Sequence, residues 1–177
     1  MPLLGLGTWD LHGGACISAV TAALKIGYRH IDTAYYYRNH KDIAEGISNS
    51  QIRREELFIT TKIWRDSLRY EEVHQQFSQC LSELRLDYVD LLLIHHPNPQ
   101  VPLAETCRAF DEIVSSGGAR SIGVSNFTNE LVSEAQQHLQ APVSNNQIQL
   151  HAGDQNPLHS YPKNNVSLTA YRPLARG

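Results

Sequence analysis

Short apolar segments typical of β-strands alternate along this chain with segments whose apolar residues recur at helical spacing. The alternation repeats about every 25 to 35 residues, a period that indicates βαβ units with parallel strands. The strand segments are residues 3–7, 28–32, 57–61, 88–94, 121–124, 143–150 and 166–171. The helical segments are residues 16–26, 40–48, 70–84, 103–115 and 129–139. A further helix is expected between the last two strands, but Pro157 and Pro162 interrupt that segment, and proline inside a helix costs about 3 kcal/mol.

This order of elements favours a (β/α)₈ or TIM barrel over a doubly wound nucleotide-binding sheet. A doubly wound sheet is expected to carry Gly-x-Gly-x-x-Gly at its first strand–helix junction, and residues 5–10 here lack the third glycine. A complete barrel takes about 250 residues. The 177 residues of this chain are therefore expected to form an incomplete parallel α/β barrel of about seven strands, without the last strand and the terminal helices. No linker interrupts the pattern, so we expect one partial barrel domain over residues 1–177.

The composition argues against a nucleic-acid-binding protein and against a membrane-spanning protein. The chain is 41% hydrophobic and 19% charged, with a formal net charge of -3. It has no basic stripe, so no nucleic-acid partner is expected, and its apolar runs are too short to span a bilayer. The N-terminal residues lack a secretory signal pattern, which favours a cytoplasmic protein. Cys16, Cys80 and Cys107 lie far apart inside helical segments, and we expect them to be reduced, buried thiols.

Four polar residues stand at or just beyond the ends of successive strand segments. Asp32, Lys62 and His95 each follow an apolar run, and Tyr37 lies in the loop after the second strand. In a parallel barrel these strand ends meet on one face, which is where active sites of this architecture lie. A carboxylate, an ammonium, an imidazole and a phenol brought together there predict a proton-transfer site.

Two other classes of function remain open at this point. His30 and Asp32, together with His95 and His96, would also suit the ligands of a metal-dependent barrel hydrolase. Such hydrolases usually offer a histidine pair on the first strand, which this chain lacks, so no metal is expected. A non-catalytic nucleotide-binding protein that keeps the barrel framework is the second alternative.

Seven short segments occur in the order, and at nearly the spacing, of one enzyme family. They are residues 5–9, 27–34, 59–62, 93–97, 122–127, 146–148 and 169–174. Through them the chain resembles the aldo-keto reductase superfamily, and in particular the bacterial 2,5-diketo-gluconate reductase type. The register of this resemblance selects Tyr37, and not its neighbours Tyr35 and Tyr36, as the family's tyrosine.

The resemblance implies the NADPH-dependent reduction of a small-molecule aldehyde or ketone to an alcohol. Tyr37 would be the general acid, and Lys62 would lower the pKa of its phenol from about 10. Asp32 would keep Lys62 charged, and His95 would orient the carbonyl oxygen of the substrate.

The resemblance also assigns cofactor and substrate residues. Residues near the cofactor would be Thr8, Asp32, Ser125, Asn126, Gln147 and Tyr171, of which Ser125 and Asn126 would hold the nicotinamide carboxamide and Tyr171 would stack on its ring. Residues near the substrate would be Trp9, Tyr37, His95 and His96. The preference for NADPH over NADH rests on the resemblance alone.

The chain also departs from the family pattern. His96 stands where the family usually has tryptophan, and Arg172 stands where it usually has serine. The family's basic segment for the adenosine phosphate follows the eighth strand, so we expect these 177 residues alone to bind NADPH weakly and turn over little. The sequence does not predict an oligomeric state.

Overall fold

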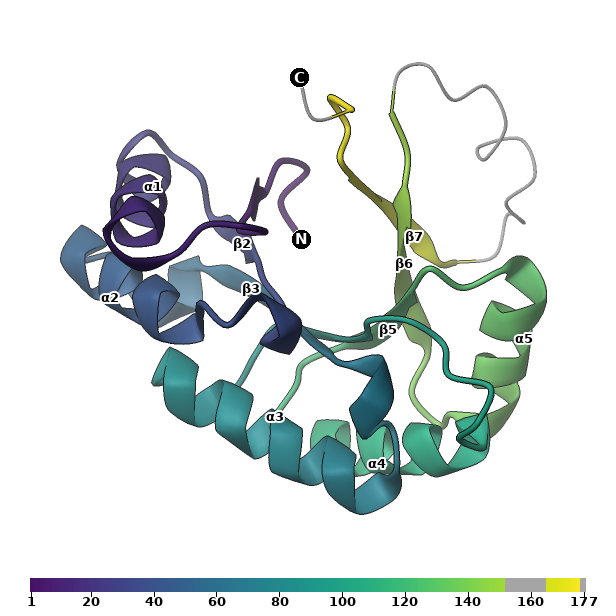
Figure 1. The fold of residues 1–177 in the computed structure, drawn as a ribbon. Coiled ribbons are helices and arrows are strands. Elements are labelled where there is room, and N and C mark those ends of the chain that lie inside the picture. Colours follow the sequence, from purple (N-terminus) through teal and green to yellow (C-terminus); the bar gives the residue numbers. More distant parts are fainter. Residues whose placement is uncertain (152–164, 176–177) are drawn as a thin grey trace.

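Seven parallel strands form one curved sheet, and helices cover its outer side (Figure 1). The structure is a computed structural model in which residues 1–151 and 165–175 are described. Every strand pairs with the next one along the chain, in the order β1 to β7. The strands are β1 (Leu6–Gly7), β2 (His30–Asp32), β3 (Phe58–Ile63), β4 (Leu91–Ile94), β5 (Ile122–Ser125), β6 (Val143–Gln149) and β7 (Ser167–Tyr171).

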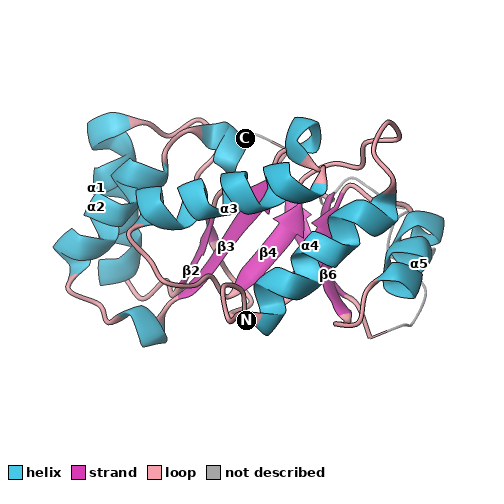
Figure 2. Ribbon diagram, turned by 90° about the horizontal axis from the view of Figure 1, so that it is seen from below, coloured by secondary structure: helices cyan, strands magenta, loops and turns pink. Residues whose placement is uncertain are grey.

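The helices follow the strands as the sequence pattern predicts, and in Figure 2 they lie across the strands. They are α1 (Gly13–Lys25), α2 (His40–Ser50), α3 (Tyr70–Leu84), α4 (Leu103–Ser115) and α5 (Asn129–His138). Short 3₁₀ turns are η1 (Tyr35–Tyr37), η2 (Arg54–Glu56) and η3 (Arg65–Ser67). The helix predicted between the last two strands falls almost wholly on residues 152–164, outside the described part of the chain.

The hydrophobic core lies between the outer side of the sheet and the helices. On β3, Ile59 and Ile63 are fully buried in this core, and Thr61 bonds the α2 histidine His40. Successive side chains of a strand point to opposite faces, so Lys62 points to the inner side instead. β3 therefore places one ammonium, that of Lys62, on the inner side of the curved sheet.

Predicted and observed boundaries agree in some elements and differ in others. The helices at 70–84 and 103–115 have the predicted bounds. The first strand is shorter than predicted, because Leu3 and Leu4 are exposed and lie outside the pairing. The fourth begins at Leu91, and Val89 before it makes one isolated bridge to Ala119.

An ion cluster closes the end of the sheet opposite to the strand ends that carry the four polar residues. The buried carboxylate of Asp90 accepts bonds from Arg54 at 2.7 Å, from Arg120 at 3.1 Å and from the backbone N–H of Ile59 at 2.9 Å. Both guanidinium groups also lie over the ring of Tyr88, at 4.0 and 4.3 Å from its centroid. These contacts join the starts of β3, β4 and β5.

The three cysteines are buried free thiols, as predicted, and burial raises the pKa of Cys80 to about 12. Within the described ranges, we find no helix with the length and apolar character that a membrane crossing requires.

Candidate active site

Lys62, Asp32 and Tyr37 form one hydrogen-bonded group at the ends of β2 and β3. The ammonium of Lys62 is fully buried and donates to Asp32 Oδ1 at 2.5 Å and to the carbonyl of Thr33 at 2.8 Å. Its third contact is the phenol oxygen of Tyr37, at 3.5 Å. An ammonium has three N–H donors, so all three are used here. The phenol oxygen accepts from Lys62, which leaves its own O–H available as a donor.

The protonation states of this group favour a charged lysine and a neutral phenol. Burial raises the pKa of Tyr37, and although Lys62 acts to lower it, the net shift is upward. Lys62 thus lowers the pKa of Tyr37 as predicted, but desolvation of the phenolate outweighs the nearby ammonium, so the net fall below the ordinary value is not found. Burial acts to lower the pKa of Lys62, but Asp32 and Tyr37 raise it overall, so Lys62 stays charged.

His95 follows β4 and supplies a neutral imidazole beside the phenol. Its ring meets the ring of Tyr37 edge-on, with 5.6 Å between centroids. Burial, followed by the charge of Lys62 and then His96, lowers the pKa of His95 to about 3. Its Nδ1 is buried and has no hydrogen-bond partner among the described residues. At neutral pH, His95 is thus an uncharged hydrogen-bonding group and not a proton source.

The predicted cofactor residues lie at the ends of β5, β6 and β7 and are bonded to one another. Ser125 Oγ donates to the carbonyl of Gln147 at 2.8 Å, and the hydroxyl of Tyr171 donates to Asn126 Oδ1 at 2.8 Å. Asn126 Nδ2 donates to the carbonyl of His95 at 2.9 Å. Asn126 has a positive φ of 62°, a conformation that asparagine tolerates better than most residues. The fold therefore brings the later strands into contact with the end of β4.

Gln147 also bonds to the hydrogen-bonded group of Lys62, Asp32 and Tyr37. Its Nε2 donates to Asp32 Oδ2 at 2.6 Å. Thr8 contributes from the other side, since its hydroxyl and its backbone N–H both donate to the carbonyl of Asp32, each at 3.0 Å. Sequence reasoning placed Gln147 and Thr8 near a cofactor and missed their bonds to Asp32. Hydrogen bonds thus connect side chains from six strand ends, those of β1, β2, β3, β5, β6 and β7.

A cavity of about 800 Å³ opens over these groups, and all the residues predicted for the cofactor and the substrate line it. Two aromatic residues that sequence reasoning passed over also form its wall. Tyr36 stacks on Trp64 with 3.9 Å between centroids, and its ring is parallel to that of Trp9 at 6.0 Å. Trp64 directly follows β3. Its position just after a strand end is the sequence feature from which its place on the cavity wall could have been predicted. Arg172 lines the same cavity.

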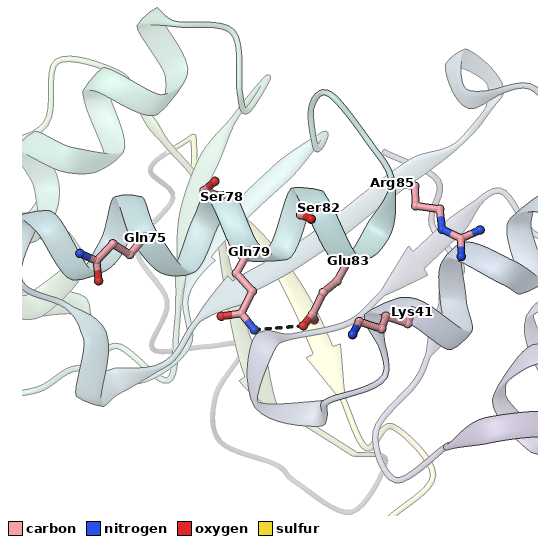
Figure 3. A pocket seen from close by; sticks show the side chains of 7 residues that line it. All are labelled: Lys41, Gln75, Ser78, Gln79, Ser82, Glu83 and Arg85. Carbon is pink, nitrogen blue, oxygen red and sulfur yellow. Dashed lines mark hydrogen bonds between the residues drawn. The ribbon is translucent and has the colours of Figure 1, made fainter.

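The structure separates the three adjacent tyrosines. Tyr35 turns away from the cavity, and its hydroxyl donates to Gln79 on α3 at 3.1 Å. Gln79 belongs to a second, outer pocket of about 540 Å³ between α2 and α3, where it also donates to Glu83 (Figure 3). Tyr36 lies on the cavity wall, and only Tyr37 contacts Lys62. The geometry therefore agrees with the register that selects Tyr37.

The residues of the alternative metal site are engaged elsewhere. His30 Nε2 lies 3.0 Å from the hydroxyl of Thr60, and its ring packs edge-on against Phe58. Asp32 is held by Lys62. Among residues 1–151 and 165–175, no three histidine, cysteine or acidic side chains are grouped to hold a metal ion. The observed contacts give no support to a hydrolase.

Comparison with known proteins agrees with this fold. The family model described as "Aldo/keto reductase family" matches residues 3–177. The chain belongs to the aldo-keto reductase family. It is 38% identical to a glyoxal reductase of Bacillus subtilis, covering 100% of this chain and 65% of that protein.

Solved structures confirm the barrel class. A putative 2,5-diketo-D-gluconic acid reductase B superposes with a TM-score of 0.95 at 38% identity, over 100% of this chain and 64% of that one. A Bombyx mori aldo-keto reductase solved in complex with NADP gives 0.86 at 34% identity, over 98% and 63%. The chain thus spans less than two thirds of the length of each of these three relatives.

Proposed function

We propose that these residues carry the proton-transfer and nicotinamide sites of an NADPH-dependent carbonyl reductase, within one barrel domain. The observation that carries this proposal is the contact of the buried Lys62 ammonium with both Asp32 and the Tyr37 phenol, in the wall of a cavity of about 800 Å³. Burying a charged lysine costs desolvation free energy that its ion pair offsets only in part, so stability alone is a weak reason for such a pair. A perturbed pKa in a cavity is typical of a functional site.

Bound at this site, NADPH would supply the hydride, with its electron pair, for the carbonyl carbon. The chain's own residues manage the proton: Tyr37 donates it to the carbonyl oxygen as that oxygen becomes negative. The products are the alcohol and the oxidised cofactor, and solvent returns one proton to Tyr37. Lys62 stabilises the phenolate that remains, and Asp32 holds Lys62 in place. His95, neutral at pH 7, offers a hydrogen bond to the same oxygen.

The side chains at the ends of β5 to β7 fit a nicotinamide. Ser125, Asn126 and Gln147 place hydroxyl and amide groups on the cavity that Tyr37 lines, and Tyr171 places an aromatic ring there. Amides match the donor and acceptor pattern of a carboxamide, and an aromatic ring can stack on the cofactor ring. These groups also bond one another, so cofactor binding would exchange some of those bonds for cofactor contacts.

The test is carbonyl-dependent oxidation of NADPH. It is measured with the 177-residue chain and with the same chain extended by the C-terminal part of the 2,5-diketo-D-gluconic acid reductase B relative. Tyr37→Phe should lower kcat/KM on the order of a hundredfold, because the proton donor is lost. Tyr35→Phe, which removes a hydroxyl bonded to α3, is the matched control and should retain activity.

Two outcomes would redirect the proposal. Activity that survives Tyr37→Phe but not Tyr36→Phe would place the proton donor on the cavity wall instead. NADPH binding without reduction of any carbonyl compound would favour a nucleotide-binding protein without turnover.

A further inference from the structure

The buried side chain of Asn39, just before α2, joins two loops at the strand ends that carry the site. Its Oδ1 accepts a hydrogen bond from the hydroxyl of Thr33 at 2.9 Å. Its Nδ2 donates to the carbonyl of Thr8 at 2.8 Å and to the carbonyl of Leu11 at 3.0 Å. Both N–H hydrogens and the amide oxygen are therefore engaged.

This use of the asparagine differs from the usual one at a helix start. At that position the side chain ordinarily accepts a hydrogen bond from a backbone N–H of the first turn, which stabilises the helix by about 1 kcal/mol. In α2, all of whose residues the structure describes, the Asn39 side chain makes no such bond. The side chain thus serves the two loops and not its own helix.

The bond from Thr33 to Asn39 closes the segment that carries Tyr37. Thr33 begins this segment after β2, and its carbonyl accepts the hydrogen bond from Lys62 at 2.8 Å. Within the segment, the N–H of Tyr37 donates to the carbonyl of Ala34 at 3.0 Å. The phenol that lies 3.5 Å from the Lys62 ammonium is therefore carried by a short segment fixed at both ends.

The two bonds from Nδ2 fix the loop after β1. Thr8 and Leu11 stand on either side of Trp9, and the ring of Trp9 meets the ring of Tyr37 edge-on, with 5.0 Å between centroids. Asn39 thus holds both the loop that carries the phenol and the loop whose indole packs against it.

We infer that Asn39 is a positioning residue for the proton donor, because its amide fastens the loop that carries Tyr37 to the loop that carries Trp9. Asn39 does not belong to the residues that line the cavity, so it acts through Tyr37 and not on the substrate. A reacting group displaced by about 1 Å can lose on the order of a hundredfold in rate. This inference rests on the proposed reductase function and deepens it.

The experiment compares two ways of releasing the loop with a matched control. Asn39→Ala removes all three bonds, and Thr33→Val removes one of them while keeping the size of the side chain. Thr21→Val is the control, because it removes a 3.2 Å bond from α1 to the carbonyl of Gly46 on α2 and leaves the loop bonds in place. Each change is made in the extended chain and in its Tyr37→Phe variant, and kcat is measured at saturating NADPH.

Asn39→Ala should lower kcat on the order of tenfold where Tyr37 is present. The same change should alter kcat by less than about twofold in the Tyr37→Phe variant, because a residue that acts through the phenol has no further effect once the hydroxyl is gone. Thr33→Val should lower kcat by about threefold or more in the same pattern. Thr21→Val should stay within about twofold of the parent in both.

A second measurement needs no turnover. The tyrosinate titration of Tyr37 is obtained as the absorbance difference between each chain and its Tyr37→Phe counterpart. Burial is the largest influence on the pKa of Tyr37 and raises it, whereas a phenol released to water titrates near pH 10. The titration should therefore move down towards about pH 10 in Asn39→Ala and in Thr33→Val, and stay in place in Thr21→Val.

Two results would overturn the inference. One is an equal fall of kcat with and without the Tyr37 hydroxyl, and the other is a titration that neither loop variant moves or that Thr21→Val moves equally. If Asn39→Ala does not fold, Thr33→Val carries both expectations. A parent chain that reduces no carbonyl compound overturns the reductase function, and the titration then still decides whether Asn39 holds the phenol in place.

Discussion

Gln147 on β6 donates a 2.6 Å hydrogen bond to Asp32 on β2, a residue 115 positions away in the chain. The other oxygen of the same carboxylate binds Lys62 at 2.5 Å. Asp32 is therefore held from two sides, and the side chain expected beside the nicotinamide is bonded to the carboxylate that holds Lys62. In the proposed reductase, the Gln147 amide would therefore link the cofactor site to the proton donor.

Gln147→Leu should lower kcat for carbonyl reduction by about threefold to tenfold, since a charged hydrogen-bond acceptor loses a donor worth about 1 kcal/mol or more. The measurement is steady-state NADPH oxidation by the extended chain at saturating cofactor. Gln149→Leu changes an exposed glutamine two positions along the same strand and serves as the control. If the two substitutions lower kcat equally, the loss comes from a change in β6 and not from the missing bond to Asp32.

Folding stability should fall as the pH drops below neutrality, and His40 should account for part of the loss. His40 is buried between Thr61, at 3.0 Å, and Glu83, at 3.6 Å, and burial lowers its pKa to about 4. The unfolded chain binds the proton near pH 6.5, so it takes up more protons than the folded chain between that pH and about 4. The stability contributed by the neutral ring is present above pH 6.5 and is lost as the pH falls towards 4.

Urea unfolding at pH 7 and pH 5 tests this linkage. The loss of unfolding free energy between the two should be smaller by about 2 kcal/mol in His40→Gln than in the parent chain. His138→Gln, an exposed site, should lose as much as the parent. An unchanged loss in His40→Gln would show that His40 takes up its proton in the folded state.

Asp90→Ala should destabilise the fold by about 3 kcal/mol, because it leaves Arg54 and the backbone N–H of Ile59 without their buried acceptor. Asp87→Ala removes an exposed carboxylate three positions earlier and should change stability by less than about 0.5 kcal/mol. Thermal or urea unfolding of the two variants provides the comparison. Similar losses in both would mean that the ion cluster adds little.

The sequence was sufficient to predict the barrel and the residues that meet inside it. Strand ends can be read from apolar runs, and parallel strands bring those ends to one face, so Asp32, Lys62 and His95 were found without coordinates. Strand lengths were harder, because the exposed Leu3 and Leu4 have the same apolar character as paired residues.

Quantities that depend on burial and distant contacts could not be predicted in this way. The pKa of Tyr37 is set by a balance between desolvation and the Lys62 ammonium, and its direction follows only from how deeply the fold buries the phenol. The bond from Gln147 to Asp32 depends on side-chain geometry across the cavity. Trp64 carries no motif, and its stacking on Tyr36 follows from the path of two loops.

In the proposed mechanism, Lys62 acts through its charge on the Tyr37 phenol. The direct measurement is the tyrosinate absorbance titration of Tyr37, obtained as the difference between a chain and its Tyr37→Phe counterpart, with and without Lys62→Met. Removing the ammonium removes the influence that lowers this pKa, so the titration of Tyr37 should move to higher pH in Lys62→Met. A Tyr37 titration that Lys62→Met leaves in place, together with weaker NADPH binding, would contradict this role and make Lys62 a cofactor contact.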